Sequence, residues 1–124
     1  MILAVASAFG GAFIKHLLDR RAERRRHAQE VRFAAYVDFL RAVAGLAQER
    51  TQENLAQAAD AKTRIAIYGS KSVAAQLSRF LAASGSLASA EGRDSLVPVF
   101  ETMRREARCG NLSRADIKTL LFGG

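Results

Sequence analysis

The two histidines, His16 and His27, are the side chains in this sequence best suited to binding a metal ion. They are eleven residues apart. On one helix that spacing corresponds to about 16 Å of axial rise, so a single ion could not bind both. Five arginines lie between them, and neighbouring positive charge opposes cation binding. We therefore predict no metal site and expect both histidines to be exposed helix residues.

The other candidates for chemistry are carboxylates, one cysteine and a glycine pair. The segment "AFGGAF" lacks the Lys-Ser/Thr of a phosphate-binding loop and follows no strand pattern. The single cysteine, Cys109, allows no intramolecular disulfide and no multi-cysteine zinc site. The carboxylates are not paired in an apolar segment as a general acid and base would be: Asp60, Glu91, Asp94, Glu101 and Glu106. We predict that the protein is not an enzyme, with no catalytic residue and no cofactor.

Clustered basic residues offer a different chemistry, the attraction of phosphate groups. The segment Lys15–Arg26 has six basic residues against Asp19 and Glu23, which gives it +4 of the total charge of +7. The rest of the chain is therefore close to an ordinary mixed surface. Such a cluster suits the headgroups of anionic lipid or the phosphates of nucleic acid. The predicted contact residues are Lys15, Arg20, Arg21, Arg24, Arg25 and Arg26.

The segment before this cluster favours lipid. Met1–Ile14 contains no charged residue. Extended through Leu18 as a helix it would be about 27 Å long, which is marginal for a hydrocarbon core of about 30 Å. The positive charge follows the apolar run, which disfavours a cleavable signal peptide and favours an anchor whose basic flank stays in the cytoplasm. Two alternatives stay open: a buried core helix, and a true N-terminus upstream of Met1.

Nucleic acid is the weaker interpretation of the basic cluster. No aromatic residue lies among the arginines to stack on bases. Acidic residues alternate with the arginines, as they do on a solvated helix face. We therefore predict anionic membrane lipid as the partner and rank nucleic acid below it.

Small residues in the apolar segment suggest a helix–helix contact. Ala6 and Gly10 are four residues apart, as are Ser7 and Gly11. This spacing lets two membrane helices approach closely. A homo-oligomer or a protein partner is one interpretation, and an anchor rich in small residues with no partner is the other.

The amino-acid composition indicates the secondary structure to which these residues belong. The chain has 124 residues, 49% of them apolar, with one proline and no tryptophan. These values indicate one all-helical domain. From Lys15 to about Arg50 there is no proline and only one glycine, so we predict one long helix that continues from the anchor.

The long helix has a broad apolar face. One stripe, at i, i+4, i+7 and i+11, is Phe33, Val37, Leu40 and Ala44, and a second stripe one step round is Tyr36, Leu40, Val43 and Ala47. We expect its own domain to cover this face and leave nothing for a partner.

Three to four shorter helices are predicted after it. One covers Gln52–Tyr68 and ends at Gly69 in a left-handed cap, and Ser70 begins the next. A further helix begins near Asp94, with Pro98 in or just after its first turn, and Ser113 caps the last. The predicted core is Phe33, Val37, Leu40, Val43, Ile65, Val73, Leu77, Phe80, Leu96, Phe100, Met103, Leu120 and Leu121.

Two stretches of the chain carry a resemblance. "IYGSKSVAAQLSRFL" (Ile67–Leu81) and "VFETMRREARCGNLSRADIKTLLFG" (Val99–Gly123) are similar to a group of small uncharacterised bacterial proteins. Those proteins look like an N-terminal membrane helix, an arginine-rich stalk and a compact helical domain. The resemblance implies single-pass membrane attachment and an all-α fold, and it implies no activity. Where a tail closer to "MRxDLG" is expected, this chain has "MRREARCG", so Arg104 and Arg105 match while Ala107 and Cys109 depart.

Together these patterns predict a protein of the bacterial inner membrane that crosses it once. Residues 1–18 would be the membrane-anchor helix, 19–30 a basic juxtamembrane stalk, and 31–124 a cytoplasmic helical domain that acts as a scaffold or interaction module. The alternative is a soluble helical interaction module whose apolar first helix docks on a larger partner. Such a module would bind protein or, as the less favoured choice, nucleic acid.

Overall fold

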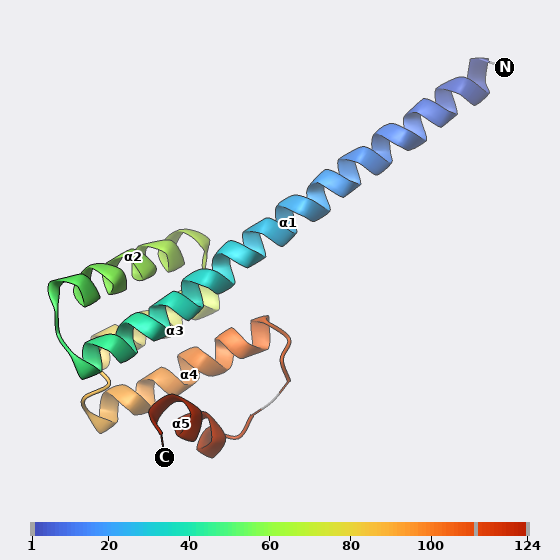
Figure 1. Ribbon diagram of the computed structural model, residues 1–124. Helices are drawn as coiled ribbons and strands as arrows, with labels where there is room; N and C mark the ends of the chain where they lie inside the picture. The colour runs from blue at the N-terminus through green and yellow to red at the C-terminus, as the bar shows by residue number, and fades with distance from the viewer. Residues whose placement is uncertain (1, 111, 124) are drawn as a thin grey trace. The chain divides into compact units, whose positions relative to one another are not determined.

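A computed structural model of the chain has five helices among the residues that it describes (Figure 1). They are α1 (Ile2–Gln48), α2 (Gln52–Tyr68), α3 (Lys71–Ala83), α4 (Ala90–Glu106) and α5 (Arg114–Phe122). The structure describes the backbone of all residues except 1, 111 and 124, and side chains from residue 14 onward apart from 111 and 124. Over this part of the chain no strand is present. The predicted all-α class is confirmed, as is a long N-terminal helix followed by shorter ones.

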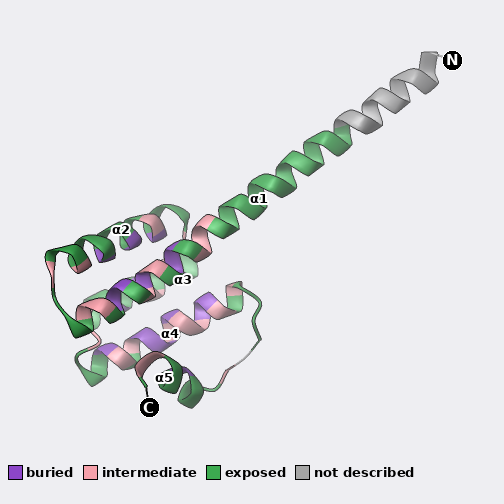
Figure 2. Cartoon of the chain, viewed as in Figure 1, coloured by how far each residue is buried: buried purple, intermediate pink, exposed green. Residues whose placement is uncertain are grey.

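The chain divides into two compact units, Met1–Val31 and Arg32–Gly124. In the first, every side chain from Ile14 to Glu30 is exposed (Figure 2). Packing therefore contributes little to this part of α1, and its helicity rests on good helix formers such as Ala, Leu, Arg and Glu.

No helix in the described part of the chain has a stretch long and apolar enough to cross a bilayer. The predicted anchor, residues 1–18, falls mostly on residues whose side chains lie outside the described part. The predicted helix-packing residues Ala6, Ser7, Gly10 and Gly11 also lie outside it.

One hydrophobic core joins four helices of the second unit. Phe39 on α1 and Phe80 on α3 lie at its centre, with ring centroids 6.2 Å apart and ring planes at 89°. Leu121 and Phe122 on α5 are partly buried against the same cluster. The fully packed members are Ala35, Tyr36, Phe39, Val43, Ala61, Ile65, Val73, Leu77, Phe80, Leu96, Val99 and Met103.

The predicted core is wrong at two positions. Val37 is 52% exposed and Leu120 is 70% exposed. On α1 the deeply buried stripe passes through Tyr36 and Val43 instead, because the other helices cover only that side of a wide apolar face. The expectation that the domain covers the whole face is therefore also wrong.

Serine and threonine caps begin the four shorter helices. The side chains of Thr51, Ser70, Ser89 and Ser113 each accept a hydrogen bond from a backbone N–H three residues on. The predicted caps at Ser70 and Ser113 are confirmed. The left-handed cap predicted at Gly69 is wrong, because this residue is extended, with φ −68° and ψ 159°.

Helix α4 begins earlier than predicted. It starts at Ala90 after the cap Ser89, so Pro98 lies inside the helix and not in its first turn. The early start depends on Gly92, which is buried against the Ser84–Ser86 loop. The sequence pattern predicted a start near Asp94, one turn later.

Candidate functional site

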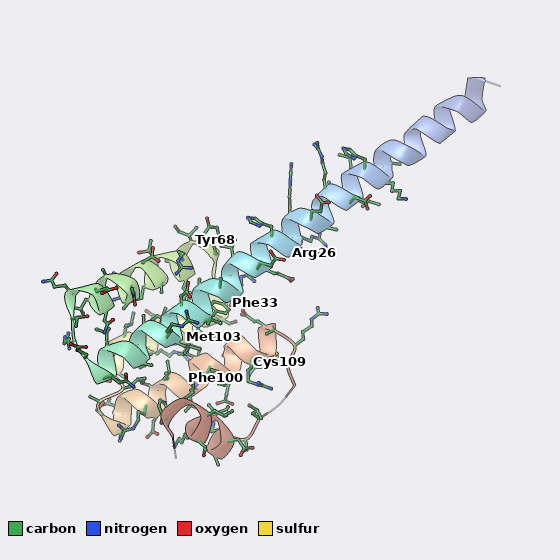
Figure 3. All side chains as sticks on the ribbon, viewed as in Figure 1. Arg26, Phe33, Tyr68, Phe100, Met103 and Cys109 are labelled. Atoms are coloured by element: carbon green, nitrogen blue, oxygen red, sulfur yellow. The ribbon has the colours of Figure 1, made fainter. Side chains whose placement is uncertain are left out.

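The predicted basic residues all lie on the exposed part of α1. Lys15, Arg20, Arg21, Arg24, Arg25 and Arg26 are each exposed. Of the ion pairs found in the described part of the chain, none involves these six residues. Their charges therefore face solvent, and Figure 3 shows the Arg26 side chain among others that extend away from α1.

These six residues surround the helix, and we name them the basic collar. Because each residue turns an α-helix by about 100°, Lys15 and Arg26 share one side, and the other four form two further pairs. Those pairs are Arg20 with Arg24, and Arg21 with Arg25. The three pairs lie roughly a third of a turn apart. A helix lying flat on a surface carries its charge on one face, so the collar suits a helix that meets an anionic surface end-on.

The histidines and carboxylates form no metal centre in the described structure. His16 and His27 are exposed on α1, as predicted. No group of three or more His, Cys, Asp or Glu side chains that could hold a metal ion occurs among the described residues.

An apolar groove lies between α1 and α4 in the second unit. Its cavity has a volume of about 150 Å³. Figure 3 labels Phe33 on α1 and Phe100 and Met103 on α4, the two helices that form its walls. The lining residues are Phe33, Tyr36, Val37, Leu40, Phe100, Met103, Arg104 and Ala107. The groove is the part of the α1 apolar face that the fold leaves uncovered.

A polar cluster of Tyr36, Ser70 and Glu106 closes one end of this region. The Tyr36 hydroxyl donates to Glu106 Oε2 at 2.8 Å and accepts from the Ser70 N–H at 3.1 Å. The Ser70 hydroxyl donates to Glu106 Oε1 and accepts from the Val73 N–H at 3.1 Å. The cluster therefore ties α1, the start of α3 and the end of α4 together. Its hydrogen bonds are mutually satisfied, so its role is structural.

Burial raises the pKa of Tyr36 above its ordinary value of 10.0, because the phenolate loses solvation. Hydrogen bonds from Ser70 lower this pKa, and the neighbouring Glu106 carboxylate raises it. Since the folded pKa is the higher one, the unfolded chain loses its proton first. The contribution of Tyr36 to stability is thus complete below pH 10.0 and is lost as the pH rises through the folded value.

We expect Tyr36→Phe to lower the free energy of unfolding by about 1–2 kcal/mol at neutral pH, because the Ser70 N–H and Glu106 lose a partner. The difference in the free energy of unfolding between the two proteins should become smaller above pH 10.0, because the wild-type protein also loses this interaction there. Urea titrations of both proteins at a series of pH values measure it. Tyr68→Phe is the control, since Tyr68 is 44% exposed. Equal losses at every pH would contradict the assignment.

A second surface cavity, about 250 Å³, lies between α1 and α2. Arg64 crosses it, pairing with Asp38 at 2.7 Å and with Asp60 at 3.1 Å. The hydrogen bond to Asp38 raises the pKa of the Arg64 guanidinium above its ordinary value. Both carboxylates are paired with the same cation, so the cavity is a structural ion-pair site.

The groove and the polar cluster were missed from the sequence. Two overlapping stripes, Phe33-Val37-Leu40 and Tyr36-Leu40-Val43, made α1 apolar over more than one face. The width of this apolar surface was the sequence signal for the groove, but all of its residues were assigned to the core. The polar cluster gave no sequence signal, because Tyr36 and Glu106 are far apart in the chain.

No protein-family model, curated protein or solved structure matches this chain. The resemblance to small bacterial membrane proteins therefore stays a prediction. The basic collar and the apolar groove are the two features of the described residues that bear on function.

Proposed function

We propose that this protein is a non-catalytic interaction module tethered to the cytoplasmic face of the bacterial inner membrane. Residues 1–18 insert in the bilayer, and the basic collar binds anionic headgroups. The unit Arg32–Gly124 is held at the membrane to bind other proteins. The observation that carries this proposal is the collar itself: exposed basic residues on all sides of α1, directly after the uncharged segment Met1–Ile14.

The energies favour this arrangement. Each basic residue near an anionic surface contributes about 1 kcal/mol, and the collar has six. Exposed apolar side chains lie beside it: Ile14 is 58% exposed, Leu17 43% and Leu18 57%. At the boundary of the bilayer these side chains would be buried in lipid while the charges stay among the phosphates.

The alternative is a soluble module whose first helix docks on a larger protein. The same exposed Ile14, Leu17 and Leu18 support it, because a protein surface could also cover them. The two proposals differ in whether the chain is integral to a membrane.

Cell fractionation tests the proposal. The full chain with a C-terminal reporter is expressed in bacteria, and the membranes are washed with high salt and then with alkaline carbonate. We expect the protein to stay in the membrane through both washes. Release by salt alone would make the collar a peripheral patch, and recovery in the soluble fraction would favour the docked module.

Charge reversal tests the collar directly. Replacing Arg20, Arg21, Arg24, Arg25 and Arg26 with Glu should displace the reporter to the periplasm or release the protein, because the flanking charge sets orientation. We expect cytoplasmic, membrane-bound reporter to fall at least about tenfold, in line with the loss of several contacts of about 1 kcal/mol each.

The control reverses the same number of exposed charges in the second unit: Arg50, Lys62, Lys71, Arg79 and Arg105. This variant has the same net charge, and we expect it to localise as wild type does. If both variants insert with the wild-type topology, the collar does not set the orientation.

A further inference from the structure

We propose that the apolar groove between α1 and α4 binds an amphipathic helix of another protein, with acidic residues beside the apolar face of that helix. This inference rests on the interaction role in the proposed function. It does not rest on the anchor, because all groove residues belong to Arg32–Gly124. Fractionation and peptide binding therefore test the two proposals separately.

The walls of the groove have the form of a helix-binding site. Phe33, Val37 and Leu40 follow one another at i, i+4 and i+7 on α1, and Phe100, Met103 and Ala107 at i, i+3 and i+7 on α4. The two helices run antiparallel here, since Tyr36 near the start of one wall bonds Glu106 at the end of the other. Two such apolar ridges accept the apolar face of a third helix.

Val37 is the most exposed of the large apolar side chains that line the groove. It lines the groove and is 52% exposed, while Tyr36 beside it is 3% exposed. Exposing an apolar side chain to water is unfavourable, and a helix bound in the groove would remove this cost by covering the side chain. A bound helix would therefore bury more apolar surface on Val37 than on Tyr36.

The charge around the groove selects the partner. Arg104 lines the groove; its Nη2 donates to the Cys109 carbonyl at 2.7 Å, while its buried Nε has no hydrogen-bond partner among the described residues. Arg104 is the basic side chain of the groove lining; Arg32 and Arg108 lie next in sequence to the lining residues Phe33 and Ala107, and the Nε of Arg32 donates to the Tyr68 carbonyl at 2.7 Å. The nearby carboxylate, Glu106, is bonded to Tyr36 and Ser70. Carboxylates on the partner are the complementary groups.

The same charge disfavours a second copy of this chain. In a two-fold dimer across the groove both copies contribute the same basic surface, so neither copy supplies the complementary acidic one. Like charges brought together at an interface oppose association. An anionic lipid would satisfy the arginines, but the paired helical ridges match the side-chain spacing of a helix.

Peptide binding to the full chain, in nanodiscs of neutral phosphatidylcholine, tests the inference. If fractionation finds the protein soluble, the same measurement is made in buffer. The probe is a fluorescein-labelled helical peptide with leucine at i, i+3 and i+7 and glutamate on both flanks, followed by anisotropy. A matched peptide carries lysine at each glutamate position. We expect the acidic peptide to bind at least about tenfold more tightly, as expected for several charge pairs at an interface.

Two variants locate the site. Val37→Glu should weaken binding of the acidic peptide at least about tenfold, as for a central interface residue. Ile67→Glu is the matched control: Ile67 is 67% exposed on α2, outside the groove, and this variant should bind as wild type does. Both positions are exposed, so circular dichroism should show both variants folded.

Three results would overturn the inference. The first is equal binding of the two peptides, or binding that Val37→Glu leaves unchanged. The second is a dimer in sedimentation that Val37→Glu abolishes while the acidic peptide does not bind, which would assign the groove to a second copy. The third is displacement of the acidic peptide by glycerol phosphate, the soluble headgroup of phosphatidylglycerol, which would assign the groove to lipid.

Discussion

Phe80→Ala is expected to lower the free energy of unfolding by about 3–5 kcal/mol. Phe80 is fully buried, and its ring packs edge-to-face on Phe39 with centroids 6.2 Å apart. Removing it leaves a cavity between α1 and α3 and takes away the aromatic contact. A domain of this size typically has about 5–15 kcal/mol of stability in all. Urea denaturation of the full chain, followed by circular dichroism, measures the loss.

The neighbouring Leu81→Ala is the matched control. Leu81 is 42% exposed on the same helix, so its loss should cost less than about 1 kcal/mol. Similar costs for the two substitutions would mean that Phe80 does not lie in a close-packed core.

The second large effect is expected at a glycine. A Cβ at Gly92 would overlap the backbone carbonyl of Ser86 and come within 2.5 Å of the Ser84 Oγ. The loop cannot move away easily, because Ser84 Oγ also accepts from the Ser86 N–H at 3.3 Å. We expect Gly92→Ala to destabilise the protein by about 2–3 kcal/mol, the cost of overpacking a buried site. Thermal unfolding of the two proteins measures it.

Gly45→Ala separates this clash from the general effect of adding a methyl group to a helix. Gly45 lies in α1, and a Cβ there would meet Asn54 atoms no closer than 3.6 Å, an ordinary contact. Alanine is the better helix former by up to about 1 kcal/mol, so this variant should be more stable than wild type. If both substitutions stabilise the protein, the start of α4 is not packed against the Ser84–Ser86 loop.

The helices were predictable where local signals agreed. Helix α2 begins and ends at the predicted residues, because Thr51 precedes a continuous apolar stripe and Gly69 interrupts it. The α3 stripe Val73, Leu77 and Phe80 is buried as predicted, since only one face of that helix is apolar.

The errors occurred where local signals conflicted. Helix α4 was predicted to begin near Asp94, but it begins at Ala90, and the Gly92 backbone in its first turn packs against Ser86. That contact is tertiary, and no local pattern encodes it. Gly69 was interpreted as a left-handed cap because of its residue type. The position instead needs glycine for lack of space, because a Cβ there would overlap the Ile65 carbonyl.

The basic collar could be predicted, and the apolar groove could not. Charged residues on an exposed helix follow from the sequence, because their positions around the helix are fixed by its geometry. The groove depends on which part of the α1 apolar face the other helices cover. Sequence periodicity gives the width of such a face but does not give its coverage, and so Val37 was assigned to the core.

The polar cluster has a consequence for local unfolding. Ser70 caps α3, and its hydroxyl is held by Glu106 in the last turn of α4. When the last turn of α4 unfolds locally, the Ser70 hydroxyl loses its hydrogen bond to Glu106, and the cap of α3 is weakened. Amide hydrogens in the last turn of α4 and the first turn of α3 should therefore exchange with solvent together. Ala107, at the end of α4, also lines the groove. A ligand bound in the groove would therefore slow amide exchange at the start of α3, although no residue of α3 lines the groove.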